Sequence, residues 1–204
     1  MKKSFKLILV FLAAICLSFA NKKNREIFVV IDASHGGKDF GSSNKEFSEK
    51  AIVASISRKI KELNSDSEIR IQFTRTDDEN LTLMQRINFI NETKPDLAIS
   101  LHINNSKELT KNGLEVYVSQ QNSVFEKSNE LAKKLMNSFY GIYPLQNNGI
   151  KTAPFLLLKK SEVPIILLEL GYLSNDFDRN YITDDQNQNE IAKIILDFVG
   201  SLKS

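Results

Sequence analysis

Residues 29–41, VVIDASHGGKDFG, join a buried strand to a polar turn, and this junction decides the fold. The apolar run over 27–32 is rich in strand-forming residues, as is typical of a strand buried on both faces. His35 follows the run, directly before Gly36 and Gly37. Glycines here let the main chain turn sharply and leave room for a substrate. Since the chain has only two histidines, this position at a strand end indicates a functional role.

Helix-like and strand-like segments alternate over the rest of the chain. Helices are expected where apolar residues recur every three or four positions, and strands where short apolar runs are bounded by turn residues. This alternation predicts a single α/β domain with a mostly parallel twisted sheet and helices on both faces. The expected helices are 49–63, 81–91, 125–140 and 190–202, and the expected strands are 27–32, 69–74, 96–101, 114–118 and 164–170.

The length and composition fit one domain with one core. The chain has 204 residues, of which 42% are hydrophobic, and we find no internal repeat or low-complexity linker. We therefore expect one catalytic domain over 25–204. A net charge of +2, from 27 basic and 25 acidic residues, is too even to indicate a nucleic-acid partner.

The first 20 residues have the parts of a secretory signal peptide. Lys2 and Lys3 stand near the start of the chain, an apolar run follows over 7–17, and a short Ser-Phe-Ala sequence ends at Ala20. The apolar run is shorter than the ~20 residues that a membrane-spanning helix needs. We expect cleavage after Ala20, no stable membrane insertion, and export to the periplasm, cell envelope or extracellular space. The alternative is an uncleaved membrane anchor.

The single cysteine, Cys16, lies inside this leader. A lipidation signal requires a small residue before the acceptor cysteine, and Ile15 stands there, so lipidation is the weaker interpretation. If the leader is removed, the mature protein has no thiol. That excludes disulfides, a thiolate nucleophile and a cysteine-ligated metal.

Three titratable side chains follow or end expected strands, and this indicates one site. They are His35, His102 at the end of LAISLH, and Glu169 in PIILLEL. Ligands of open parallel sheets bind at the carboxyl ends of the strands. Each residue has an ordinary alternative: a polar loop residue, a core histidine bonded to a carbonyl, or an acid paired with a cation. Burying an unpaired carboxylate is costly, however, and the run around Glu169 contains no lysine or arginine.

A metal ion would compensate the negative charge of a buried carboxylate at this site. Hydrolytic zinc commonly takes two histidines and one carboxylate and keeps a fourth position open. Glu49 is the candidate carboxylate, because it begins the expected helix 49–63 on the apolar face that packs on the sheet. One alternative is a first-turn acid after Ser48 as N-cap, which stabilises the helix dipole by ~0.3–1 kcal/mol. The other is that Glu46 is the ligand.

The sequence resembles the zinc-dependent N-acetylmuramoyl-L-alanine amidases of the type-3 amidase family, which hydrolyse bacterial peptidoglycan. The matching motifs run in family order: IDASHGGKDFG (31–41), SEKAIVASISRKI (48–60), TRTDDENLTLMQRINFIN (74–91), ISLHIN (99–104), GLEVYVS (113–119) and PIILLELGYLSN (164–175). The departures are Ala33-Ser34, where the family usually has Pro-Gly or Ala-Gly, and Phe40, where it usually has proline. These change the stiffness of the turn more than its chemistry.

The resemblance implies the roles of four residues. His35, Glu49 and His102 would bind one Zn²⁺, and Glu169 would be the catalytic acid and base. The reaction would be hydrolysis of the amide bond between N-acetylmuramic acid and L-alanine, for cell-wall turnover or daughter-cell separation.

Arg75, Arg86 and Asn104 are weaker candidates for substrate binding. An arginine can hold a substrate carboxylate through two hydrogen bonds, but arginines on a loop and on an exposed helix are more often solvated, so that interpretation is favoured for these two. Asn104 is equally explained as a turn cap. Asp39 is expected to fix the glycine loop, and Asn175 to order the loop after the last strand.

Some family members carry a long inserted helix that blocks the zinc until an activator displaces it. Here the corresponding interval, 120–124, is short, so we expect an open site that requires no activator protein. The rival functions are a catalytically silent peptidoglycan-binding or scaffold protein, which would be free to lose the four site residues, and a zinc peptidase, which would share them.

Overall fold

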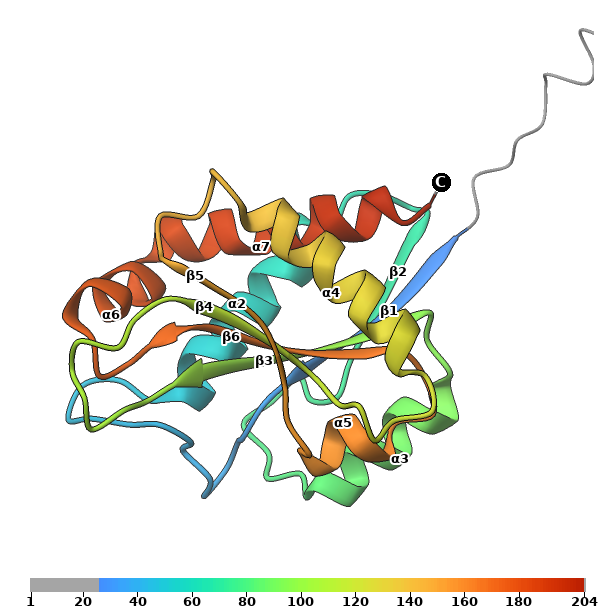
Figure 1. Cartoon of the computed structure of the whole chain (residues 1–204), viewed down its shortest axis with the longest axis horizontal. Coiled ribbons are helices and arrows are strands. Elements are labelled where there is room, and N and C mark those ends of the chain that lie inside the picture. The colour runs from blue at the N-terminus through green and yellow to red at the C-terminus, as the bar shows by residue number, and fades with distance from the viewer. Residues whose placement is uncertain (1–25, 204) are drawn as a thin grey trace, which may run out of the picture.

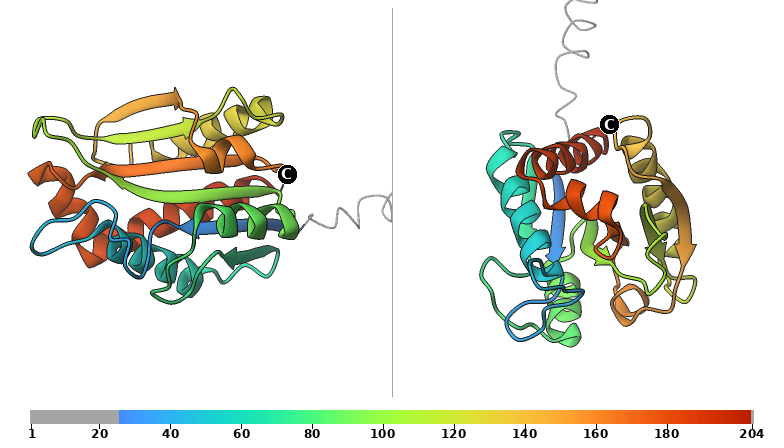
Figure 2. Two further views of the ribbon diagram at one scale, coloured as in Figure 1. Left: turned by 90° about the horizontal axis from the view of Figure 1, so that it is seen from below. Right: turned by 90° about the vertical axis from the view of Figure 1, so that its left-hand side faces the viewer.

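A six-stranded sheet lies at the centre of the computed structural model, which describes residues 26–203 (Figure 1). The strands are β1 (Ile27–Ala33), β2 (Ile69–Phe73), β3 (Leu97–Asn104), β4 (Leu114–Val118), β5 (Asn147–Thr152) and β6 (Ile165–Tyr172). Their order in the sheet is β2-β1-β3-β6-β4-β5. Neighbours are parallel except for β4 and β6, which are antiparallel. Figure 2 shows β5 at one edge of the sheet and β2 at the other.

Helices cover both faces of this sheet. One face packs against α2 (Glu49–Leu63), α4 (Phe125–Phe139) and α7 (Asp185–Ser201). The opposite face packs against the shorter helices α3 (Leu83–Thr93) and α5 (Leu156–Lys160). Helix α6 (Asp176–Thr183) follows β6 and contacts both β6 and α7. The predicted α/β class, with a mostly parallel sheet covered on two faces, is confirmed.

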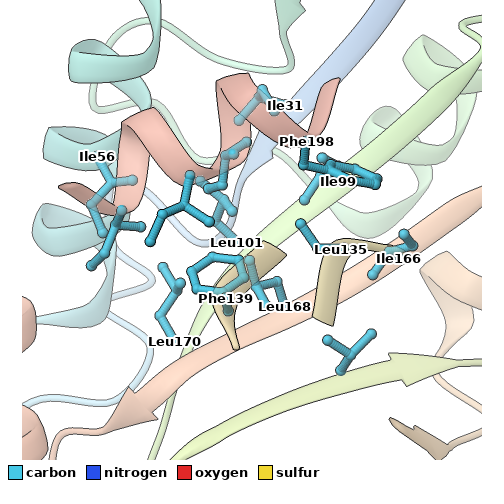
Figure 3. Close-up of a cluster of buried hydrophobic side chains, with 14 of the residues drawn as sticks. Ile31, Ile56, Ile99, Leu101, Leu135, Phe139, Ile166, Leu168, Leu170 and Phe198 are labelled. Atoms are coloured by element: carbon cyan, nitrogen blue, oxygen red, sulfur yellow. The ribbon is translucent and has the colours of Figure 1, made fainter. Parts of the chain in front are cut away.

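The core follows from the alternation of side chains along each strand. In β1, Val29 and Ile31 belong to the larger cluster beneath α2, α4 and α7, whereas Phe28 and Val30 belong to the smaller cluster beneath α3 and α5. Figure 3 shows part of the larger cluster, in which Phe198 of α7 lies near Ile99 of β3. Complete burial of one such side chain contributes ~1.5–3 kcal/mol, so the larger cluster is the main source of stability.

The polar residues of the site lie on the face that carries the smaller cluster. That cluster ends along β1, β3 and β6 at Val30, Ala98 and Leu167. Polar side chains occupy the next positions on the same face, because side chains alternate with a period of two. They are Asp32, Ser100, His102 and Glu169.

Three elements were not expected from the sequence. Strand β5 has the sequence NNGIKT, whose side chains are exposed or only partly buried at the sheet edge, so it lacks the apolar alternation of a buried strand. Helix α5 has five residues, too few to display a helical period. Helix α6 has eight residues and is mostly polar, with an N-cap at Asn175 whose side chain accepts hydrogen bonds from the first turn. The expectation that Asn175 orders the loop after the last strand agrees with this cap.

The expected boundaries also shift at several ends. Helix α3 begins at Leu83 rather than at 81, because Thr82 and Gln85 form a capping box. Helix α7 begins at Asp185 rather than at 190, after the N-cap Asp184. Within 26–203, we find no helix with the length and apolarity needed to cross a bilayer. The predicted signal peptide over 1–20, with Cys16, lies outside the described residues.

Candidate metal centre

The structure brings His35, Glu49 and His102 together. Their potential ligand atoms all lie within 4.8 Å of one another. Glu49 Oε1 is 3.1 Å from His35 Nε2 and 2.9 Å from His102 Nδ1. The three residues come from the loop after β1, the first turn of α2 and the end of β3. Glu46, the alternative ligand, is exposed and does not belong to this group.

The glycine loop fixes the direction of the His35 ring. His35 has a φ of 57°, and Gly36 and Gly37 also have positive φ angles. Two main-chain hydrogen bonds join Gly36 and Asp39 (2.9 and 3.0 Å). Asp39 Oδ2 lies 2.8 Å from His35 Nδ1, and its Oδ1 accepts a hydrogen bond from the Gly41 amide (3.1 Å). Asp39 thus fixes the loop, as expected, and leaves Nε2 of His35 facing Glu49, in the way carboxylates orient metal-binding histidines.

Two main-chain amides hold the carboxylate of Glu49. Ile103 N donates to Oε1 (3.0 Å) and Ser42 N donates to Oε2 (2.8 Å). The residue is only 4% exposed, and burial opposes its charge, but the hydrogen bonds and charges of His102 and His35 lower its pKa well below the usual range. Two imidazole nitrogens facing an ionised carboxylate are a donor set that fits a divalent cation such as Zn²⁺.

The electrostatics of His35 reflect the same carboxylates. Burial lowers the pKa of this imidazole, but the hydrogen bond and charge of Glu49, followed by those of Asp39, outweigh burial and raise the pKa to about 9. The negative charge collected around the ring therefore stabilises a cation at this point, either a proton or a metal ion.

Glu169 lies next to the group, on the strand beside His102. The two residues are register partners between β3 and β6. Glu169 Oε2 is buried and has no hydrogen-bond partner among the described residues. Burial raises the pKa of this carboxyl to about 7, with the charges of Glu49 and Glu115 adding to the rise and that of His102 opposing it. A carboxyl with such a pKa can both accept and donate a proton near neutral pH.

Gly41 is a site residue that the sequence reasoning missed. Its φ is 62°, and a Cβ atom there would lie 2.5 Å from Glu49 Oε2 and 2.6 Å from His35 Cδ2. Only glycine fits this position without displacing the candidate ligands. The sequence signal was the third glycine of HGGKDFG, whose neighbours become visible only in three dimensions.

The two candidate arginines are buried, so the interpretation of solvated side chains is wrong. Arg75 donates from Nε to Ala33 O and from Nη2 to Ser34 O, both at 2.9 Å. Arg86 donates from Nη1 to Asp32 Oδ1 (2.6 Å) and from Nη2 to the carbonyl of His35 (2.5 Å). Both guanidinium groups are therefore bonded to the segment that carries His35, instead of being free for a substrate carboxylate.

A cavity of about 630 Å³ opens above these residues. Its polar lining includes the candidate metal ligands, Glu169 and Asn104, and its apolar lining includes Leu83 of α3 and Phe155 beside α5. Asn104 Oδ1 accepts from the Asn105 amide (2.8 Å). The expected substrate-binding candidate Asn104 thus lines the cavity, while its side-chain oxygen bonds the next main-chain amide.

A second buried carboxylate, Glu115, was missed as well. It faces Glu169 as the register partner across β4 and β6 and is 2% exposed. Its sequence signal was the same as that of Glu169, an acid between apolar residues of a strand. The pKa of Glu115 is lowered, because hydrogen bonds from Lys151, Tyr117 and Tyr172 outweigh the effect of burial.

Several known proteins are similar to this chain in sequence and in fold. The probable cell wall amidase LytH of Staphylococcus saprophyticus is 31% identical over 172 residues, and the match covers 83% of this chain and 56% of the relative. The chain thus spans about half the length of this staphylococcal relative. The catalytic domain of CwlV, an N-acetylmuramoyl-L-alanine amidase from Bacillus (Paenibacillus) polymyxa, superposes with a TM-score of 0.80 at 30% identity, over 86% of this chain and 97% of that one.

A third comparison involves a complex. The CwlD amidase from Clostridioides difficile, solved with the GerS lipoprotein, matches with a TM-score of 0.77 at 28% identity, over 87% of this chain and 97% of that one. The family model described as N-acetylmuramoyl-L-alanine amidase matches residues 29–201, which includes every candidate site residue. The chain belongs to this N-acetylmuramoyl-L-alanine amidase family.

Proposed function

We propose that this chain is a zinc-dependent N-acetylmuramoyl-L-alanine amidase of peptidoglycan. The observation that carries the proposal is the convergence of His35, Glu49 and His102 beside Glu169, whose buried oxygen lacks a hydrogen-bond partner within the described structure. Family membership supports the substrate and the bond, the amide between N-acetylmuramic acid and L-alanine. The role would be cell-wall turnover or daughter-cell separation.

His35, Glu49 and His102 would hold the ion through one nitrogen or oxygen each. When bound, Zn²⁺ supplies Lewis-acid polarisation of the scissile carbonyl and acidifies water. Glu169 then takes the proton from the attacking water at its free oxygen and delivers it to the departing alanine nitrogen. Burial raises the pKa of this carboxyl, and a raised pKa favours uptake of the proton from water.

Arg75 and Arg86 serve this chemistry indirectly in our proposal. Their hydrogen bonds to the carbonyls of residues 33–35 position the loop that carries His35, so they are positioning residues instead of substrate contacts. Asn104 lines the cavity and remains the candidate for contact with a substrate amide.

Export and independence from an activator are further parts of the proposal. Export is supported by the expected leader and by relatives named cell wall amidases. An open site is supported by residues 120–124, which form only a short turn before α4. Since CwlD was solved with a lipoprotein, purified protein must be assayed alone and with candidate partners. Activity only after addition of a partner would refute independence.

Mass spectrometry of the reaction products tests the function directly. Protein lacking residues 1–20 is incubated with muropeptides and glycan strands, with and without a chelator. We expect release of stem peptides that begin with L-alanine, loss of this activity with chelator, and recovery with zinc. Cleavage within the stem would identify a peptidase. No cleavage by folded, zinc-loaded protein would favour a silent wall-binding protein or a requirement for an activator.

A further inference from the structure

A row of polar side chains continues from the catalytic face toward the sheet edge. Glu169 on β6 faces Glu115 on β4, and Lys151 on β5 donates from Nζ to Glu115 Oε1 (2.6 Å). The side chain of Glu115 is 3% exposed, whereas that of Lys151 is 43% exposed. The row thus ends in the partly exposed ammonium group of Lys151, which the buried carboxylate of Glu115 holds in place.

Glu115 is saturated with donors, and this fixes the position of the Lys151 ammonium. Besides Lys151, it accepts from Tyr117 OH (2.7 Å), Tyr172 OH (2.8 Å) and Asn104 Nδ2 (3.4 Å). Asn104 itself lines the catalytic cavity. The ammonium has three N–H donors, and its bond to Glu115 uses one of them. The remaining donors are available to a ligand without a loss of side-chain order.

Besides the proposed metal ion and the histidines that would hold it, the catalytic cavity has little positive charge to offer an acidic substrate. Among the described residues that line it, Arg86 is the one with a permanent positive charge, and Asp32 and main-chain carbonyls already bind its guanidinium. Acidic residues in the same lining are Asp32, Asp39, Glu49 and Glu169. Since the proposed ion would act at the scissile amide, a cation available to a carboxylate farther along the stem must lie outside the cavity.

Lys151 stands at the distance that a short peptide spans. Adjacent strands are ~4.8 Å apart, so β5 lies ~10 Å from the Glu169 strand, two strand spacings away. An extended peptide covers about 3.3–3.6 Å per residue. The second or third residue of a stem peptide, counted from the scissile bond, would then reach Lys151. Phe155 of the cavity wall packs against Tyr117, the register neighbour of Lys151, so these two aromatic rings link the cavity wall to Lys151.

We propose that Lys151, anchored by Glu115, binds a carboxylate of the stem peptide and makes the enzyme selective for stems with free carboxylates over amidated ones. This inference rests on the proposed amidase function. It assigns a specificity residue to strand β5, which carries none of the candidate ligands or catalytic groups.

Two muramyl tripeptides test the subsite, one with free carboxylates on its second and third residues and one with both amidated. We expect metal-loaded protein to show a kcat/KM about tenfold higher for the free acid, as for a hydrogen bond between charged groups. Lys151→Met should reduce this ratio to about one, chiefly through KM, and Lys151→Arg should retain it. Lys133→Met on the exposed surface of α4 is the matched control and should keep the ratio.

A second variant covers the risk that Lys151→Met leaves a buried charge unpaired. The double variant Glu115→Gln with Lys151→Met removes both charges and should show the same ratio of about one. An equal loss on both substrates would mean a purely structural role and would overturn the proposal, as would wild-type protein without preference. Failure of metal-loaded wild-type protein to cleave either substrate, both alone and with candidate partners, would instead refute the amidase function, and the subsite with it.

Discussion

Glu169 shows how much a single residue contributes at this site. It is an acid inside an apolar strand, and the structure leaves one of its oxygens buried without a hydrogen-bond partner in the part of the chain described. An unpaired buried carboxyl lowers the stability of the fold. A catalytic role would explain why the protein has one here. The effect of Glu169 on catalytic rate and its effect on the free energy of unfolding can therefore be measured separately.

The catalytic use is tested by Glu169→Gln. This change keeps the shape of the side chain and removes the base, so we expect a loss of roughly 10²–10⁴ in rate, as for removal of a general base. Zinc content, measured by atomic absorption on the same samples, should stay at the wild-type level. Near-normal turnover would contradict the assignment of Glu169 as the proton carrier.

The destabilising effect of Glu169 is tested by the pH dependence of stability in chelator-treated protein. The folded pKa of Glu169 is about 7, above its ordinary value of 4.5, so its ionisation destabilises the fold. This penalty is absent below about pH 4.5 and complete above about pH 7. In urea unfolding, Glu169→Gln should gain about 3 kcal/mol over wild type at pH 8 and little at pH 4.5. Exposed Glu46→Gln is the control, and an equal gain at both pH values would contradict the prediction.

At the scale of elements, the loop between β1 and α2 determines how closely the candidate metal ligands His35 and Glu49 can approach each other. A Cβ atom added at Gly41 would clash with Glu49 and His35, so Gly41→Ala should lower zinc affinity about 10–100-fold, the range seen when support of metal ligands is lost. Gly141→Ala is a matched control, because Gly141 also has a positive φ (75°) but no atom within 4 Å of an added Cβ. Competition with a fluorescent zinc chelator measures both affinities. Equal zinc affinities for the two variants would contradict this role of Gly41.

The elements also show what sequence can and cannot predict. Strands β1, β3 and β6 were predictable because they are buried apolar runs, and the titratable residues in or just after these runs identified His35, His102 and Glu169. The helical face of α2 identified Glu49. The exposed edge strand β5 and the five-residue α5 lack a periodic signal.

Contacts between distant segments were equally hidden in the sequence. The bond of Arg86 to the carbonyl of His35 joins residues 51 apart, and the bond of Lys151 to Glu115 joins residues 36 apart. Neither separation is set by a local period, so the support of His35 and the cation on β5 emerge only from the packed structure.

At the scale of the whole molecule, metal binding should contribute to stability. An ion that binds only the folded state stabilises it by ~4 kcal/mol when its concentration is about a thousand times Kd. We therefore expect zinc to raise the melting temperature of chelator-stripped protein. His102→Ala should remove this shift, whereas Glu46→Gln should keep it. The measurement is differential scanning fluorimetry with and without zinc, and a shift that survives His102→Ala would place the ion elsewhere.

The carboxylate of Glu49 has one more consequence, because it accepts the Ile103 amide while facing His102, 53 residues away in the sequence. If β3 slipped by one residue against β1, the period of two would turn His102 to the opposite face of the sheet. A slipped chain would still have a sheet and a core, but it would fail to capture the ion. In the proposed enzyme, zinc binding would therefore require the correct strand register, and only correctly paired molecules would gain the stability and the activity that the ion is expected to bring.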